Sequence, residues 1–171
     1  MDGVCAQVLI HAGSGGVGHF AIQIAKALGC VVVATSSSKN KDFVMSLGAD
    51  EHIDYRAQAF EEVLSDIDFV LDPFGGENLE KCIGIVKKGG KIVSLPEPPS
   101  EEVMSKAEAA GVTVEFILVA SNGANMQTLK GYLEDGTVKP HVSKTFSFAE
   151  MAESHAELES GRTVGKIIVT V

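Results

Sequence analysis

The chain has 171 residues, of which 45% are hydrophobic and 22% charged, and its formal net charge is −9 at pH 7. This length suits one ordinary domain with a real core, and the composition excludes a disordered chain. The acidic balance argues against nucleic acid or an anionic membrane surface as the main partner. Backbone N–H groups of an acidic protein can still bind a phosphate.

No segment indicates a membrane or an export route. The longest apolar runs, such as residues 116–120, are too short to span a bilayer, and no charged-then-apolar leader opens the chain. We therefore expect a cytoplasmic protein. Cys5, Cys30 and Cys82 are odd in number and widely spaced, which favours reduced thiols. They cannot supply the four clustered ligands of a structural zinc site, so we expect no metal.

Apolar, β-branched runs alternate with helical patterns along most of the chain. The run at 7–11 precedes a helix at about 16–28, whose apolar face should hold Phe20, Ile24 and Leu28. Further strands are predicted at 31–36, 51–55, 68–72, 90–95 and 112–119. Helices are predicted at 41–48, near 57–64, at 77–86, at 101–110 with Ser100 as N-cap, and at 125–136.

This alternation predicts an α/β fold over residues 1–136, a doubly wound parallel six-stranded Rossmann sheet with helices on both faces. Residues 137–171 break the pattern with a helix at about 148–159 and a strand at 166–171. We expect this stretch to form a C-terminal helix–strand appendage. The predicted strand 112–119 is strongly apolar and would lie at a sheet edge, where unpaired strands invite pairing.

A glycine-rich turn joins the first predicted strand to the first helix. Gly13, Gly15 and Gly18 have the spacing GxGxxG. In that motif the first glycine permits a tight turn, the second lets a pyrophosphate approach the backbone, and the third lets the helix pack closely. The anion would lie against free N–H groups at the helix N-terminus. The order strand, loop, helix, strand favours dinucleotide binding. A glycine-rich turn kept only for packing is the alternative.

The residues after the second strand indicate which dinucleotide is bound. Proteins that bind NAD usually place an acidic residue there, whereas this chain has "TSSSKNK" over 35–41 and no acid before Asp42. Hydroxyl groups and lysines suit a phosphate, which favours NADP(H). The alternative is a solvated helix cap, with Ser38 or Asn40 as the capping residue. The Gly-Lys-Ser/Thr sequence of a P-loop is absent after Gly18.

Five segments together resemble the medium-chain dehydrogenase/reductase superfamily, and within it the zinc-free NADPH:quinone oxidoreductases and enone reductases. These segments are "HAGSGGVGHFAIQIAKALG", "SLGADEHIDY", "VLDPFGGENLEKC", "GGKIVSL" and "GRTVGKIIV". The resemblance covers about residues 6–171. It implies transfer of hydride from NADPH to a small-molecule quinone or activated alkene, with no catalytic residue assigned in this chain. It also implies a homodimer joined through residues 112–119.

Members of that group carry an N-terminal, GroES-like catalytic domain before the cofactor domain. The resemblance therefore implies that this chain is the cofactor-binding portion, with residues 137–171 normally packed on that other domain. We expect the chain alone to be inactive or weakly active. A non-catalytic nucleotide-binding or interaction module derived from the fold is the alternative.

The same resemblance assigns the cofactor to particular residues. The pyrophosphate would lie on Ala12, Gly13, Ser14, Gly15, Gly16, Val17 and Gly18. The 2′-phosphate would be surrounded by Ser36, Ser37, Lys39, Asn40, Lys41 and Tyr55. The nicotinamide ribose would lie near Asp72, Phe74, Ser94, Leu95 and Pro96, and the ring near Leu118 and Val119. Arg162 and Gly165 would approach the cofactor from the C-terminal segment. His11, by contrast, is expected to be a packed, hydrogen-bonded residue and not an acid.

Overall fold

A parallel sheet forms the centre of the computed structural model, which describes residues 6–171. Its strands lie in the order β3-β2-β1-β4-β5-β6, which is the order of the Rossmann fold. The strands are β1 (Gln7–Ile10), β2 (Val31–Ser36), β3 (Glu51–Asp54), β4 (Ile67–Asp72), β5 (Val86–Ser94) and β6 (Thr113–Phe116). The predicted six-stranded parallel sheet is therefore confirmed.

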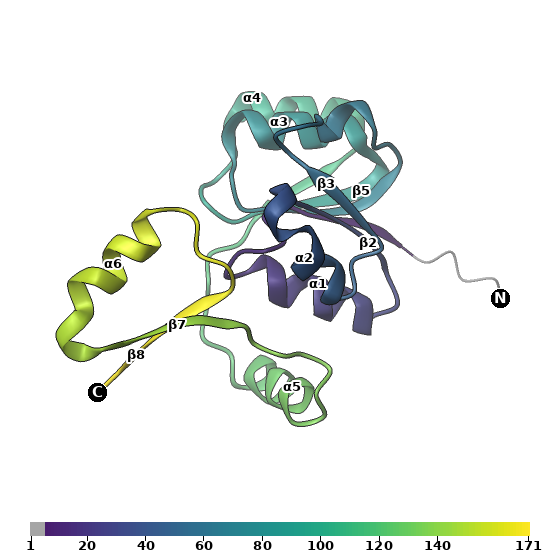
Figure 1. The fold of residues 1–171 in the computed structure, drawn as a ribbon. Coiled ribbons are helices and arrows are strands. Elements are labelled where there is room, and N and C mark those ends of the chain that lie inside the picture. Colours follow the sequence, from purple (N-terminus) through teal and green to yellow (C-terminus); the bar gives the residue numbers. More distant parts are fainter. Residues whose placement is uncertain (1–5) are drawn as a thin grey trace.

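Helices cover both faces of this sheet (Figure 1). On one face lie α1 (Gly18–Ala27) and α2 (Lys41–Ser46), which pack on Val8, Ile10 and Ala34. On the other lie α3 (Gly76–Ile85) and α4 (Glu101–Ala110), which pack on Leu9, Val33 and Val70. Successive residues of a strand point to opposite faces, so burial on both sides requires the continuous apolar runs seen in the sequence.

The buried face of α1 differs from the predicted one. Ile22 is buried together with the polar His19 and Gln23, whereas Leu28 is 68% exposed. Both polar side chains make hydrogen bonds, although His19 Nε2 is buried without a partner among the described residues. His19 Nδ1 lies 2.8 Å from the carbonyl oxygen of Gly15, and the Gln23 amide bonds to both the N–H and the carbonyl of Lys139. Apolar spacing alone therefore selected the wrong side of this helix.

Two predicted elements are shorter than expected. The helix predicted near 57–64 is only a 3-10 turn, Phe60–Glu62, because Ala59 is extended and Asp66 has a positive φ of 57°. The sixth strand ends at Phe116 and not at residue 119. Its neighbour β5 ends at Ser94, and Pro96 beyond it has no N–H to offer, so later residues lack a partner strand.

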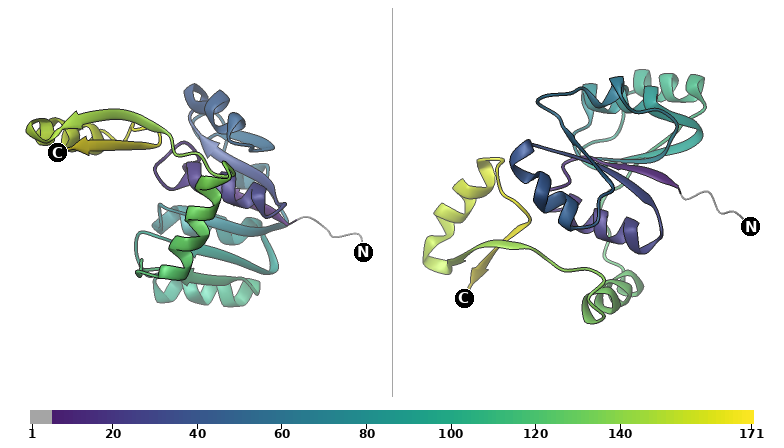
Figure 2. Two further views of the ribbon diagram at one scale, coloured as in Figure 1. Left: turned by 90° about the horizontal axis from the view of Figure 1, so that it is seen from below. Right: turned by 45° about the vertical axis from the view of Figure 1, so that its right-hand side comes forward.

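The C-terminal part contains α5 (Gly123–Glu134), β7 (Val142–Ser147), a 3-10 turn (Phe148–Glu150), α6 (Met151–Glu159) and β8 (Lys166–Thr170). The predicted helix and final strand are present, whereas β7 was not predicted. It pairs in parallel with β8 in a separate two-stranded sheet. Figures 1 and 2 show that β7, α6 and β8 project away from the six-stranded sheet.

Two of the three cysteines lie within the described residues. Cys82 is buried and Cys30 partly buried, and both are free thiols. Cys5, the third predicted thiol, lies outside the described residues. Within residues 6–171, no helix combines the length and the apolar character needed to cross a bilayer.

Candidate functional site

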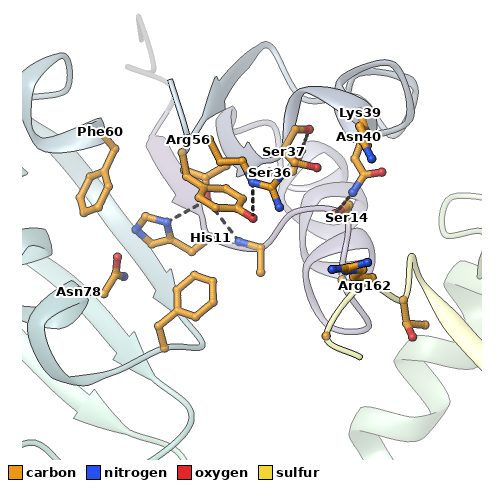
Figure 3. Close-up of a pocket in the computed structure, with 17 residues that line it drawn as sticks. His11, Ser14, Ser36, Ser37, Lys39, Asn40, Arg56, Phe60, Asn78 and Arg162 are labelled. Atoms are coloured by element: carbon orange, nitrogen blue, oxygen red, sulfur yellow. Dashed lines mark hydrogen bonds between the residues drawn. The ribbon is translucent and has the colours of Figure 1, made fainter. Parts of the chain in front are cut away.

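A cavity of about 810 Å³ opens at the carboxyl ends of β1 and β2. Ligands of doubly wound folds bind outside the carboxyl ends of the strands, where the strand order reverses, and here the reversal falls between β1 and β4. Figure 3 shows the lining side chains converging on this space. They are His11, Ala12, Ser14, Gly15, Thr35, Ser36, Ser37, Lys39, Asn40, Tyr55, Arg56, Phe60, Phe74, Asn78, Gly161, Arg162 and Thr163.

The glycine loop between β1 and α1 forms one wall. It turns at Ala12, which has a φ of 50°, and the Gly15 N–H donates to the Ala12 carbonyl at 2.8 Å. A side chain at Gly18 would collide with that same carbonyl oxygen, so this glycine allows the close packing that the motif predicts. Gly13 needs a different explanation from the predicted one. The positive φ lies at Ala12, and a Cβ at Gly13 would come within 3.0 Å of Ala34 and Ile22.

Three backbone donors of this loop have no acceptor within residues 6–171. Among the described residues, no group accepts a hydrogen bond from the amides of Gly16, Val17 and Gly18. These amides stand at the N-terminus of α1, whose first turn contains no acidic residue. The helix dipole makes this end partly positive, so the loop can hold an anion without any charged side chain.

The cavity is basic although the protein is acidic. Its lining includes Lys39, Arg56 and Arg162 but no aspartate or glutamate. Arg56 lies over the Tyr55 ring, 5.5 Å from its centroid, and its Nε donates to the Tyr55 hydroxyl at 3.2 Å. Asn40 Nδ2 donates to Ser14 Oγ at 3.0 Å, which joins the segment after β2 to the glycine loop. This set of cations and hydroxyls suits a ligand with several phosphates.

His11 lies in the cavity wall, buried as predicted. Its Nδ1 is 3.0 Å from Thr35 Oγ1 and its Nε2 is 3.4 Å from Cys82 Sγ. Its ring meets those of Phe60 and Phe74 edge-on, with centroids 4.6 Å and 6.0 Å apart. Burial lowers the pKa of His11 to about 4, although nearby Glu61 opposes this shift. The imidazole is therefore neutral near pH 7, which agrees with the structural role expected for it.

Asp72 organises the turn after β4 from beneath. It is fully buried and accepts hydrogen bonds from the Phe74 N–H at 3.0 Å, the Gly75 N–H at 3.1 Å and Asn78 Nδ2 at 2.8 Å. Burial raises the pKa of Asp72, and these three donors work against that shift. The carboxylate therefore fixes where Phe74 and Asn78 stand, and both line the cavity.

Many of the predicted site residues line the cavity together. Those that do are Ala12, Ser14, Gly15, Ser36, Ser37, Lys39, Asn40, Tyr55, Phe74 and Arg162. Those that do not are Gly13, Gly16, Val17, Gly18, Lys41, Asp72, Ser94, Leu95, Pro96, Leu118, Val119 and Gly165. Several of the latter lie just outside it. The Gly165 N–H, for example, donates to the Ser14 carbonyl at 2.9 Å and brings the C-terminal segment to the glycine loop.

Leu118 and Val119 stand apart from the other predicted residues. They follow the early end of β6 and are 75% and 91% exposed.

Sequence reasoning also missed seven lining residues: His11, Thr35, Arg56, Phe60, Asn78, Gly161 and Thr163. His11 and Thr35 could have been found, because they stand at the carboxyl ends of the predicted strands that flank the loop. Arg56 could have been found as the cation next to Tyr55.

Within the part of the chain that the structure describes, no three histidine, cysteine, aspartate or glutamate side chains lie where they could hold a metal ion together. The described residues therefore do not fit a zinc ion.

Comparison with known sequences places the chain among dehydrogenases. The family model described as "Zinc-binding dehydrogenase" matches residues 47–169. The chain is 36% identical over 169 residues to 2-methylene-furan-3-one reductase of Solanum lycopersicum, covering 95% of this chain and 39% of that protein. It is 34% identical over 169 residues to the chloroplastic NADPH-dependent alkenal/one oxidoreductase of Arabidopsis thaliana, covering 95% and 40%. The chain thus spans less than half the length of these two relatives.

Solved structures give the same result. The quinone oxidoreductase from Coxiella burnetii matches with a TM-score of 0.90 and 33% identity, over 97% of this chain and 53% of that one. An NAD-dependent alcohol dehydrogenase matches with a TM-score of 0.87 and 28% identity, over 99% of this chain and 52% of that one. Because nearly all of this chain aligns, the similarity extends beyond the six-stranded sheet to the C-terminal strands.

Proposed function

The chain belongs to the zinc-binding dehydrogenase family, within the medium-chain dehydrogenases/reductases, and on that premise we propose that it is the NADP(H)-binding part of a quinone or enone oxidoreductase. The observation that carries this proposal is the cavity at the carboxyl ends of β1 and β2. The three cations Lys39, Arg56 and Arg162 line it with no aspartate or glutamate among the lining residues, and the free amides of residues 16–18 directly follow Gly15 in its wall. The names of the two plant relatives support an enone as the hydride acceptor.

The glycine loop fits a pyrophosphate. The unpartnered amides of Gly16, Val17 and Gly18 would donate to its oxygens, and the positive end of α1 would stabilise its charge. A Cβ on Gly15 would stand 3.2 Å from the Ala12 carbonyl oxygen, so the loop is held in a compact form that keeps its backbone accessible. Arg162, from the C-terminal segment, would contribute a charged donor on the other side of the cavity.

The 2′-phosphate is proposed to lie among the residues that follow β2 and β3. Ser36, Ser37, Lys39, Tyr55 and Arg56 all line that end of the cavity. Arginine pairs well with phosphate because its guanidinium offers parallel donors. No aspartate or glutamate is among the described lining residues, and the nearby Asp54 accepts a hydrogen bond from the Arg56 N–H at 3.0 Å. This lining favours NADP(H) over NAD(H).

The nicotinamide half is proposed to extend toward the carboxyl ends of β4 and β5. There Asp72 holds the turn that carries Phe74, and the Leu95 N–H donates to the Asp72 carbonyl at 3.0 Å, joining the two strand ends. NADPH supplies the hydride when bound, and this chain orients the cofactor and excludes water from it. Because a quinone or enone delocalises the developing negative charge, the proton can come from solvent.

Substrate contacts and assembly remain proposals that follow from the family. We infer that residues 137–171 pack on a catalytic domain contributed by the remainder of a longer protein, since the relatives are about twice as long or longer. Copies of the chain are proposed to pair along the open edge of β6, which ends the sheet. Cytoplasmic localisation stays a prediction, because one relative is named as chloroplastic.

Reduction can be tested directly on this chain. NADPH is mixed with the protein and either a small quinone or an α,β-unsaturated ketone, and cofactor oxidation is followed by absorbance. We expect tight NADPH binding with slow turnover, because the second wall of the substrate cleft is not supplied. Binding without any turnover, even when the rest of the protein is present, would instead support a non-catalytic nucleotide-binding module.

A further inference from the structure

A row of hydrogen bonds runs from the cavity wall into the core beneath it. Thr35 Oγ1 lies 3.0 Å from His11 Nδ1, and His11 Nε2 lies 3.4 Å from Cys82 Sγ. All three residues are at most 2% exposed. Thr35 is at the end of β2, His11 directly follows β1, and Cys82 is on α3. The row therefore links three elements that meet at the site, and no step of the proposed function uses it.

The inner end of the row has a defined proton arrangement. Burial raises the pKa of the Cys82 thiol, so its sulfur carries a hydrogen near pH 7. Buried polar hydrogens require acceptors, and His11 Nε2 is the strongest acceptor within reach of this thiol. Since the imidazole is neutral, accepting at Nε2 leaves the ring hydrogen on Nδ1. That hydrogen is donated to Thr35 Oγ1.

The other His11 tautomer, with its hydrogen on Nε2, would make weaker hydrogen bonds. A hydrogen on Nε2 would point at a sulfur, which is a weak acceptor, and the Cys82 hydrogen would lose the imidazole nitrogen as its acceptor. Rotation of the ring is opposed by the edge-on contacts with Phe60 and Phe74. The surroundings of His11 thus favour one tautomer in one orientation.

The Thr35 hydroxyl, at the outer end of this row, has only its own hydrogen left to donate. Thr35 Oγ1 also accepts from the Ala12 N–H at 3.3 Å, so both of its acceptor positions are taken. The hydroxyl hydrogen has no acceptor among the described residues, yet Thr35 lines the cavity. It therefore stands next to the turn of the glycine loop with a donor available to a ligand.

We propose that Thr35 donates its hydroxyl hydrogen bond to an oxygen of the dinucleotide's sugar–phosphate chain, and that His11 is the positioning residue that fixes this direction. This inference rests on the proposed function, because it needs a dinucleotide in the cavity. It adds a binding residue to those of the glycine motif and gives Thr35, the first residue of the "TSSSKNK" segment, a defined hydrogen-bonding role. It also explains why a buried polar ring is retained beneath the loop.

Two substitutions of Thr35 separate the effect of its hydroxyl group from the effect of its side-chain volume. Thr35→Val keeps the volume but removes both the donor hydrogen and the oxygen that accepts from His11 and Ala12. We expect it to weaken NADPH binding about tenfold or more, the size of a lost hydrogen bond with its partner left unpaired. Thr35→Ser keeps the hydroxyl and should restore most of the affinity. Titrations with adenosine 2′,5′-bisphosphate and with nicotinamide mononucleotide then identify the half of the cofactor that receives the bond, because only one of them should respond to Thr35→Val.

NMR of labelled histidine rings in the unmodified chain reads the tautomer directly and needs no variant. We expect the His11 hydrogen on Nδ1 both with and without NADPH. A hydrogen on Nε2, or a Thr35→Val chain that binds NADPH as tightly as the wild type, would overturn the inference while leaving NADP(H) binding intact. If the wild-type chain binds neither NADPH nor the bisphosphate, the proposed function itself fails, and that result is distinct from the other two.

Discussion

Replacement of Gly18 by alanine tests the packing on which the glycine loop depends. A Cβ at this position would collide with the carbonyl oxygen of Ala12 and lie 2.8 Å from both the Ala12 carbonyl carbon and the Gly13 Cα. All of these are backbone atoms, so no side-chain rotation can relieve the overlap. Either the loop or the first turn of α1 must move.

The cost can be estimated from the contacts. Overpacking of this kind costs about 1–3 kcal/mol. Alanine in place of glycine returns at most about 1 kcal/mol of helix propensity, and less at position 18 because it is the first residue of α1. We therefore expect the free energy of unfolding to fall by about 1–3 kcal/mol, since little of that cost is returned at the first residue of the helix. Movement of the loop also displaces the Gly16 and Val17 amides, so NADPH affinity should fall about tenfold or more.

Gly84→Ala is the matched control. Gly84 is the second-last residue of α3, and a Cβ there meets no atom within 4 Å. The same chemical change should not destabilise the protein and should stabilise it by at most about 0.5–1 kcal/mol, because glycine is unfavourable in a helix. Urea denaturation measures both variants, and calorimetric titration with NADPH measures binding. A Gly18→Ala chain that is as stable as Gly84→Ala and binds NADPH like the wild type would refute the assigned role of this glycine.

Other parts of the site should respond to pH, to charge and to the loss of a hydrogen bond. Burial holds the pKa of His11 near 4 instead of 6.5. Between pH 4 and pH 6.5 the unfolded chain therefore binds more protons than the folded chain. This group alone should lower the free energy of unfolding by about 3 kcal/mol as the pH falls through that window. Urea denaturation of His11→Gln with an unchanged pH slope would contradict this. Lys39→Met or Arg56→Met should weaken NADPH about tenfold and NADH far less, with a smaller difference in high salt. Equal losses for the two cofactors in calorimetry would argue against a phosphate there. Gln23→Leu removes both bonds to the Lys139 backbone and should cost about 1 kcal/mol. Hydrogen exchange at Lys139 should then be faster, and unchanged protection would show that this contact is dispensable.

The six-stranded parallel sheet was predictable because both of its faces are buried. That burial requires continuous β-branched runs, and the helices between them have recognisable ends. Ser100, for instance, accepts from the Val103 N–H as a capping residue should, and Gly111 ends α4 with a positive φ of 70°. Local chemistry of this kind can be recognised from the sequence alone.

What could not be predicted depends on contacts between distant residues. His19 and Gln23 look like surface residues of α1, and only the carbonyl of Gly15 and the backbone of Lys139 make their burial acceptable. Strand β7 has no apolar run of its own and forms because β8 pairs with it. The shortened end of β6 follows from where β5 stops.

The candidate site likewise combines residues that could be predicted from local sequence with residues that could not. The glycine loop and the cations after β2 were predicted from local sequence, since they adjoin the ends of strands. Phe60 was missed because its segment was predicted to be a helix, whereas it is a short turn that brings the ring to His11. Arg162 was expected from the family resemblance, and Gly161 and Thr163 beside it were not.

Paired calorimetric titration of this chain with NADPH and with NADH tests the central claim most directly. We expect both to bind the glycine loop, with NADPH at least about tenfold tighter because Lys39 and Arg56 meet its additional phosphate. Equal affinities, or tighter binding of NADH, would contradict the assignment of the segment after β2 to a phosphate. Absence of binding for both would contradict the assignment of the cavity to a dinucleotide.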